Sequence, residues 1–212
     1  MQKLHGVTHA PRPFWLVAIP AGTALVAMAL AKLASASALW WDVAWTSASV
    51  CALAGTLLGR GAVTGPARAR WTLWVAACAF WLIGQLAWDL FGIVGTPATP
   101  NPADLSWWMF AILITLSMAR RRTQSGALRA VAAAEVLPVI AGATALTFAL
   151  LWHHVANSML PEAQRLAVLV YPTLYVSAAV LALQGLIGGG AYGVRMLPSR
   201  LGLVGVMAQA GA

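Results

Sequence analysis

Six long apolar stretches constrain the fold of this sequence more than any other feature. A transmembrane helix needs about 20 consecutive apolar residues, within a range of roughly 17 to 25. A seventh apolar stretch begins at residue 201 and reaches residue 212 after only 12 residues, too few to span a bilayer. The sequence therefore predicts six complete transmembrane helices and a truncated seventh. In chain order, the seven stretches are residues 14–33, 36–59, 71–94, 102–119, 130–152, 164–188 and 201–212.

Charge is too scarce in this sequence for a water-soluble protein. Of the 212 residues, 61% are hydrophobic and 8% are charged, whereas soluble domains carry about 25% charged residues. The same hydrophobicity excludes a disordered chain. The stretches also lack the alternating pattern of a transmembrane β-barrel. The predicted fold class is thus all-α, a polytopic integral membrane bundle that forms a single transmembrane domain over residues 1–212.

The basic residues fall mainly in every second connection between the apolar stretches, and this distribution predicts the orientation of the chain. Cytoplasmic loops of membrane proteins are enriched in Lys and Arg. Only Lys32 and Arg165 fall on one side of the predicted helices, and the other 11 of the 13 basic residues fall on the opposite side. The N-terminus is therefore predicted to be cytoplasmic, and the net charge of +8 reflects topology rather than nucleic-acid binding. Ala34-Ser35-Ala36 also fits a signal-peptide cleavage site, but the first stretch is longer than the roughly 7–15 residues of a signal-peptide core.

The acidic residues gather on the side opposite to the bases. Asp42, Asp89, Asp104 and Glu162 are predicted in the outer half, and Glu135 near the inner face. In the stretch 71–94, one helical face carries Trp81, Gly84, Gln85, Trp88 and Asp89. Ionisable residues within spans usually face a bundle interior or a wet cavity, so this face predicts a ligand site. The alternative is that Asp89 reaches interfacial water, and that the tryptophans form an ordinary aromatic belt.

The loop that follows this helix carries a helix-start signal. Asn101 is a good N-cap, Pro102 suits the first helical position, and Asp104 suits the positive end of the helix. A structural role for Asp104 and a ligand-contacting role beside Asp89 both remain open. The predicted ligand-binding residues are Trp81, Gln85, Trp88, Asp89, Asp104 and Trp107.

No catalytic, metal or cofactor motif is found in the sequence, so the chain is not expected to be an enzyme. His153 and His154 are adjacent, and adjacent helical residues point in different directions, which disfavours a shared metal site. Gly55 and Gly59 match the GxxxG pattern, which leaves open either a homodimer interface or packing within the chain.

Two helices and their connecting loop resemble a known family. The pattern runs from Trp71 through Trp81-x-x-Gly84-Gln85-x-x-Trp88 to Pro100-x-Pro102-Ala103-Asp104-x-x-Trp107. It is similar to the multi-pass N-terminal membrane regions of bacterial GGDEF/EAL cyclic di-GMP signalling proteins and of related histidine kinases. Gln85 stands where an acid is common in that pattern, and Asn101-Pro102 replaces a Pro-Ser pair. The resemblance implies a cytoplasmic output domain beyond residue 212.

These observations lead to one expected function and one alternative. The expected function is a membrane-embedded sensory region of a bacterial signal-transduction protein, located in the inner membrane. Its expected partners are the lipid bilayer and a small-molecule or lipid ligand. The alternative is a transporter or a small accessory subunit of a membrane complex, for which Pro138 and Pro172 would break helices.

Overall fold

The structure is a computed structural model that describes residues 15–33, 37–95, 97–119 and 126–187. The described residues form helices joined by short connections and contain no strand. The all-α fold class predicted from the sequence is therefore confirmed. In chain order, the helices are α1 (Trp15–Leu33), α2 (Ser37–Gly61), α3 (Gly65–Val94), α4 (Pro102–Ala119), α5 (Gly126–Ala156) and α6 (Glu162–Ile187).

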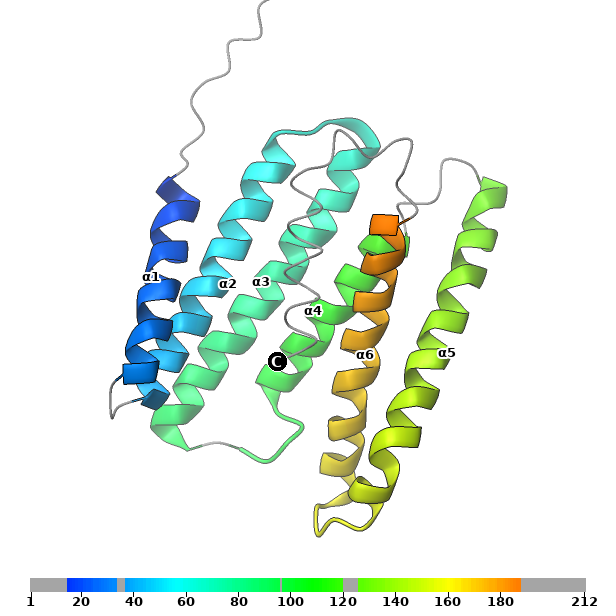
Figure 1. The fold of residues 1–212 in the computed structure, drawn as a ribbon. Coiled ribbons are helices and arrows are strands. Elements are labelled where there is room, and N and C mark those ends of the chain that lie inside the picture. The colour runs from blue at the N-terminus through cyan, green and yellow to red at the C-terminus, as the bar shows by residue number, and fades with distance from the viewer. Residues whose placement is uncertain (1–14, 34–36, 96, 120–125, 188–212) are drawn as a thin grey trace, which may run out of the picture.

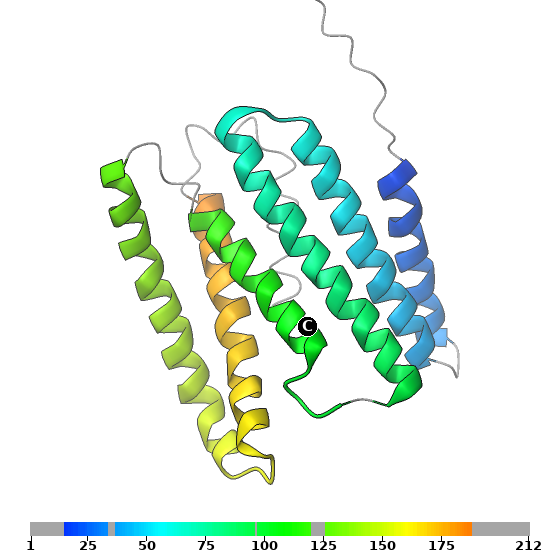
Figure 2. The same cartoon turned by 180° about the vertical axis from the view of Figure 1, so that it is seen from behind.

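The six helices lie side by side in one row. Figure 1 and Figure 2 show the spatial order α1, α2, α3, α4, α6, α5, with each helix antiparallel to its predecessor in the chain. The helices α1 and α5 form the two edges of the row, and α4 packs between α3 and α6. The two most central helices are thus α3 and α4, which carry the predicted ligand-binding residues.

Four of the six helices are long and apolar enough to cross a membrane. These are α1, most of α3, the second part of α5, and α6 up to Leu183. The prediction of six complete spans plus a seventh is borne out only in part, because α2 and α4 do not meet both criteria. Hydroxyl residues and Asp42 make α2 less apolar, while α4 is apolar but shorter than the others. Residues 201–212 lie outside the described residues.

Large apolar side chains are exposed along the helices of the row. Leu25 on α1, Leu137 and Leu150 on α5, and Ile83 on α3 are each more than half exposed. Soluble proteins rarely expose broad apolar surfaces, because such surfaces associate in water. The exposed apolar surface and the four apolar helices together indicate that this is a membrane protein.

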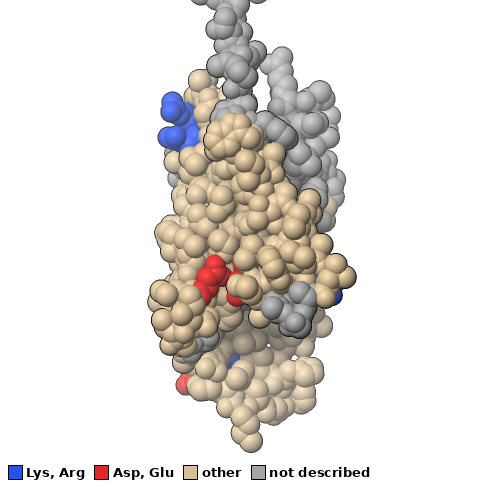
Figure 3. Space-filling view, turned by 90° about the vertical axis from the view of Figure 1, so that its left-hand side faces the viewer, with Lys and Arg blue, Asp and Glu red and all other residues tan. Residues whose placement is uncertain are grey.

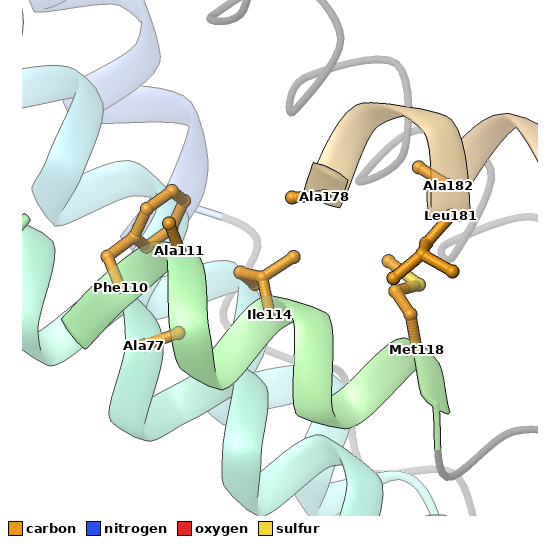
Figure 4. Packing of buried hydrophobic residues seen from close by; sticks show 8 residues of the cluster. All are labelled: Ala77, Phe110, Ala111, Ile114, Met118, Ala178, Leu181 and Ala182. Atoms are coloured by element: carbon orange, nitrogen blue, oxygen red, sulfur yellow. The ribbon is translucent and has the colours of Figure 1, made fainter. Parts of the chain in front are cut away.

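A small core joins α3, α4 and α6 (Figure 4). Ile114 and Phe110 of α4 pack with Ala77 of α3 and with Ala178 and Leu181 of α6. Several positions in this core are alanines, and small residues let neighbouring helix backbones approach closely in membranes. This core fixes α4 against both of its neighbours.

Close packing also fixes the α2–α3 hairpin. The ring of Trp71 on α3 lies directly against Gly59 on α2, so that a side chain at position 59 would clash with it. At Gly55, the nearest atom to an added Cβ is Val17 on α1, at 4.0 Å. Both glycines of the GxxxG pattern therefore pack against helices of the same chain.

Replacing Ile114 tests the core directly. Ile114 is fully buried, whereas Ile112 on the same helix is 38% exposed. Ile114→Ala removes van der Waals contacts and leaves a cavity, so we expect it to lower the free energy of unfolding by about 2 kcal/mol. Ile112→Ala should change it by less than about 0.5 kcal/mol. Thermal unfolding of the two variants in the same detergent measures the difference, and equal losses would contradict the assigned core.

Candidate functional site

Charged residues lie at opposite ends of the helix row. Three of the acidic residues, Asp42, Asp89 and Asp104, lie at the end where α1 joins α2 and α3 joins α4, which we call the acid end. Arg60, Arg68 and Arg70 lie around the α2–α3 connection, at the opposite or basic end. The face drawn in Figure 3 shows its main basic and acidic patches separated by uncharged surface. The separation of acids from bases predicted from the sequence is confirmed for these residues.

The first polar cluster joins α2 to α3 at the acid end. The carboxylate of Asp89 accepts a hydrogen bond from Thr46 Oγ1 at 2.5 Å and another from Gln85 Nε2 at 2.9 Å. Gln85 is buried and Asp89 half-buried. Asp42 lies one helical turn before Thr46 on α2. Asp89 is therefore held by donors from two helices.

The second polar cluster forms at the start of α4. Asn101 Oδ1 accepts hydrogen bonds from the backbone N–H groups of Ala103 (2.9 Å) and Asp104 (3.3 Å). In return, Asp104 Oδ2 accepts a bond from the backbone N–H of Asn101 at 2.8 Å. This reciprocal pair resembles a capping box with Asp in place of Glu or Gln. The predicted N-cap role of Asn101 is confirmed.

Asp104 also has a partner on another helix. Its Oδ1 accepts a hydrogen bond from the hydroxyl of Tyr171 on α6 at 2.5 Å. Asp104 is only 5% exposed, so its carboxylate is removed from water and depends on these donors. The structural role and the site role of Asp104 are thus compatible, because one oxygen caps α4 and the other bonds α6.

Trp107 connects the two clusters. Its ring lies against Gly84 of α3, where an added Cβ would be 2.7 Å from Trp107 Nε1 and 3.2 Å from the carbonyl oxygen of Ala103. The centroid of the Trp107 ring is also 5.8 Å from that of Trp88 on α3. Gly84 allows this approach because it has no side chain, and it sits beside Gln85 of the first cluster.

Three buried hydrogen-bond donors on or beside α4 have no acceptor among the described residues. They are Asn101 Nδ2, Trp107 Nε1 and Trp108 Nε1. Buried polar groups normally find a partner, and an exception calls for an explanation such as a water or a ligand. Asn101 and Trp108 share a helical face with Asp104, and the ring of Trp108 packs edge-on against Tyr171. Donors and acceptors are therefore both present at this site, which suits noncovalent binding of a polar group.

The structure brings together five of the six predicted site residues. Gln85, Trp88 and Asp89 lie on α3 facing α2 and α4, while Asp104 and Trp107 lie on the first turns of α4. Trp81 differs, because its ring packs against Phe110, 5.6 Å between centroids, at the border of the apolar core.

Sequence reasoning missed two residues of the site. Thr46 lies one helical turn from Asp42, which gave a weak signal on the same helix. Tyr171 lies in an apolar stretch 67 residues after Asp104, and no sequence pattern indicated that α6 packs beside α4.

The histidine pair does not form a metal centre with described residues. Asn157, which directly follows α5, donates a hydrogen bond from Nδ2 to the backbone carbonyl oxygen of His153, and the ring of His153 lies 85° from that of His154. Among the described residues, no group of three or more His, Cys, Asp or Glu side chains could hold a metal ion.

A pair of glycine substitutions tests the contact between α3 and α4. Gly84→Ala places a methyl group into the Trp107 ring, so we expect a loss of about 1–3 kcal/mol in the free energy of unfolding. Gly92→Ala on the same helix meets open space, and should be neutral or stabilising by up to about 1 kcal/mol, because alanine favours helix. Chemical or thermal unfolding in detergent measures both variants. A neutral Gly84→Ala would show that Trp107 does not pack there.

Comparison with known proteins gives no match to this chain among protein-family models, curated proteins or solved structures.

Proposed function

We propose that this chain is the membrane-embedded sensory region of a bacterial signal-transduction protein, and that it senses a ligand or a membrane state at its acid end. The observation that carries the proposal is the pair of linked polar clusters, built by α2, α3, α4 and α6 around Asp89 and Asp104. Ionisable groups are costly within a membrane and usually serve a function there. No catalytic arrangement accompanies them among the described residues, so binding is the role that the site supports best.

The buried donors support a ligand that supplies acceptor atoms. Asn101 Nδ2 and the indole N–H groups of Trp107 and Trp108 would each gain a partner from a carbonyl, carboxylate or hydroxyl oxygen. The indole rings offer apolar surface beside these donors. A small polar molecule or a lipid headgroup has this combination of chemistry.

The position of α4 offers a route for a signal through the membrane. Trp107 is wedged against Gly84 near the acid end, and further along α4 the core residues Ile114 and Met118 pack towards the basic end. Binding that shifts Trp107 would change how α4 packs on α3, and the rigid helix would carry the shift along its length. In the proposed orientation, the basic end faces the cytoplasm, where the resemblance to GGDEF/EAL proteins and histidine kinases places an output domain.

The antiparallel row supports six crossings. The apolar helices α1, α3 and α5 run in the same direction, and the chain returns between them through α2 and α4. With a rise of about 1.5 Å per residue, the 18 residues of α4 span about 27 Å, close to the roughly 30 Å of a bilayer core. We therefore propose that α2 and α4 also cross, with the N-terminus in the cytoplasm of an inner membrane.

The transporter alternative has less support. It relied on helices broken near the middle of the membrane. The helices α5 and α6 instead continue through Pro138 and Pro172, and the described acids of the candidate site lie towards one end of the row.

Output measurements in the full-length protein test the sensory proposal. Asp89→Asn and Asp104→Asn each leave a side chain of the same shape but remove the charge that their donors stabilise. We expect each variant to change the signalling output, read as cellular cyclic di-GMP or as kinase phosphorylation, by about tenfold, the effect of losing about 1.4 kcal/mol of coupling. Glu162→Gln is the matched control, because Glu162 is an exposed acid in the first turn of α6. Site variants that express normally and signal like the control would contradict the proposal.

A further inference from the structure

The basic end of the α2–α3 hairpin carries a group of arginines held in a defined arrangement. Arg60 lies in the last turn of α2, and Arg68 lies near the start of α3. Arg60 Nε donates a hydrogen bond to Thr72 Oγ1 at 2.9 Å, and Thr72 Oγ1 donates to the carbonyl oxygen of Arg68 at 2.9 Å. One hydroxyl thus connects Arg60 of the first helix to the backbone at Arg68 of the second.

The hairpin beneath these residues is closely packed. The ring of Trp71, next to Thr72, packs against Gly59, next to Arg60, too closely for any side chain at position 59. Packing therefore fixes the backbone next to Arg60, and the bond to Thr72 positions its guanidinium. That bond uses the Nε–H alone, and the four remaining N–H donors of a guanidinium lie on its two Nη atoms. Two Nη groups form the fork that binds a phosphate with two parallel hydrogen bonds.

The location of these arginines indicates which source of phosphate they would bind. The apolar stretch within α3 begins at Trp71, and Arg68 lies about one helical turn before it, so Arg68 lies at the boundary between apolar core and headgroups. The first turn of α3 contains no acid. Arg70 lies two residues after Arg68 and therefore on a different face of the helix. The acids of the first and second polar clusters lie at the opposite end of the row. The basic patch at one end of the face in Figure 3 shows the same separation.

We propose that the α2–α3 hairpin binds the phosphate of an anionic phospholipid through the guanidinium of Arg60, with Arg68 as a second cation and Thr72 as the residue that positions Arg60. An anionic lipid fits better than a zwitterionic one, because the cations Arg60 and Arg68 repel a headgroup ammonium. This site is separate from the acid end and does not depend on the sensory function. It makes the lipid composition of one leaflet a determinant of how α2 and α3 are held together.

Lipid retention by the purified protein tests this site. Native mass spectrometry from detergent compares bound phosphatidylglycerol with bound phosphatidylcholine at equal concentrations. We expect the wild-type protein to retain phosphatidylglycerol preferentially, and Arg60→Gln to weaken that retention by about tenfold, as for loss of a bidentate charge-assisted contact. Thr72→Val keeps every charge but removes the anchor of Arg60, so it should weaken retention several-fold. Lys32→Gln is the control, because Lys32 is an exposed cation at the opposite end.

The outcomes separate a specific lipid site from general charge attraction. Retention lowered by Arg60→Gln and Thr72→Val but unchanged by Lys32→Gln supports the proposal. Equal loss in Arg60→Gln and Lys32→Gln, or no loss in Thr72→Val, would overturn it. Complete displacement of the lipid by millimolar inorganic phosphate would also overturn it, since the site would then bind free phosphate rather than a lipid. A circular dichroism spectrum of each variant verifies that the helices are retained.

Discussion

A charge without hydrogen-bond partners raises the free energy of a protein steeply in an apolar environment, and the arrangement of these helices follows from avoiding it. Lipid tails offer no hydrogen bonds, so every polar group within the membrane must find its partners inside the protein. Asp104 meets this requirement through the backbone of Asn101 and the hydroxyl of Tyr171, and Asp89 through Thr46 and Gln85. Each carboxylate accordingly joins two helices. Hydrogen bonds thus join α2 to α3 and α4 to α6, and close packing at Gly84 joins the two pairs.

The contact at Gly84 makes α4 the central element of the molecule. Near the acid end, Trp107 fills the space left by the missing side chain, and further along, alanines and Ile114 form the core with α3 and α6. The second polar cluster forms at the start of this helix, and Gln85 of the first cluster is adjacent to the Gly84 contact. The helix α3 also carries Trp71, which contacts Gly59 on α2. The proposed sensory site and the proposed lipid site therefore lie at opposite ends of the same group of packed helices.

Local features of the site were predictable from the sequence, because they depend on residues close together in the chain. Asn101, Pro102 and Asp104 indicated the start of α4, and the structure has its N-cap there. Helix spacing placed Gln85 beside Asp89, and a hydrogen bond joins them. The helix α3 begins at Gly65 rather than at the predicted Trp71, because apolarity shows where lipid contact begins and not where a helix begins.

Contacts between distant segments were not predictable in this way. Thr46 and Asp89 are 43 residues apart, and Tyr171 and Asp104 are 67 apart. The spatial order that places α6 between α4 and α5 decides which of these side chains meet, and helical periodicity contains no information about that order. For the same reason, helical spacing put Trp81 on the face of the predicted site. It could not show that Trp81 packs against Phe110 across the α3–α4 interface.

In the proposed orientation, the acid and basic ends of the row lie on opposite sides of a membrane. Cysteine labelling tests this orientation, in a background where Cys51 and Cys78 are replaced by alanine. Single cysteines are introduced at the exposed positions Ala98 and Met159, at the acid end, and at Thr64, at the basic end. In intact cells, a membrane-impermeant maleimide should label Ala98→Cys and Met159→Cys, and should label Thr64→Cys only after the membrane is permeabilised. Labelling of Thr64→Cys and Ala98→Cys from the same side would contradict the account.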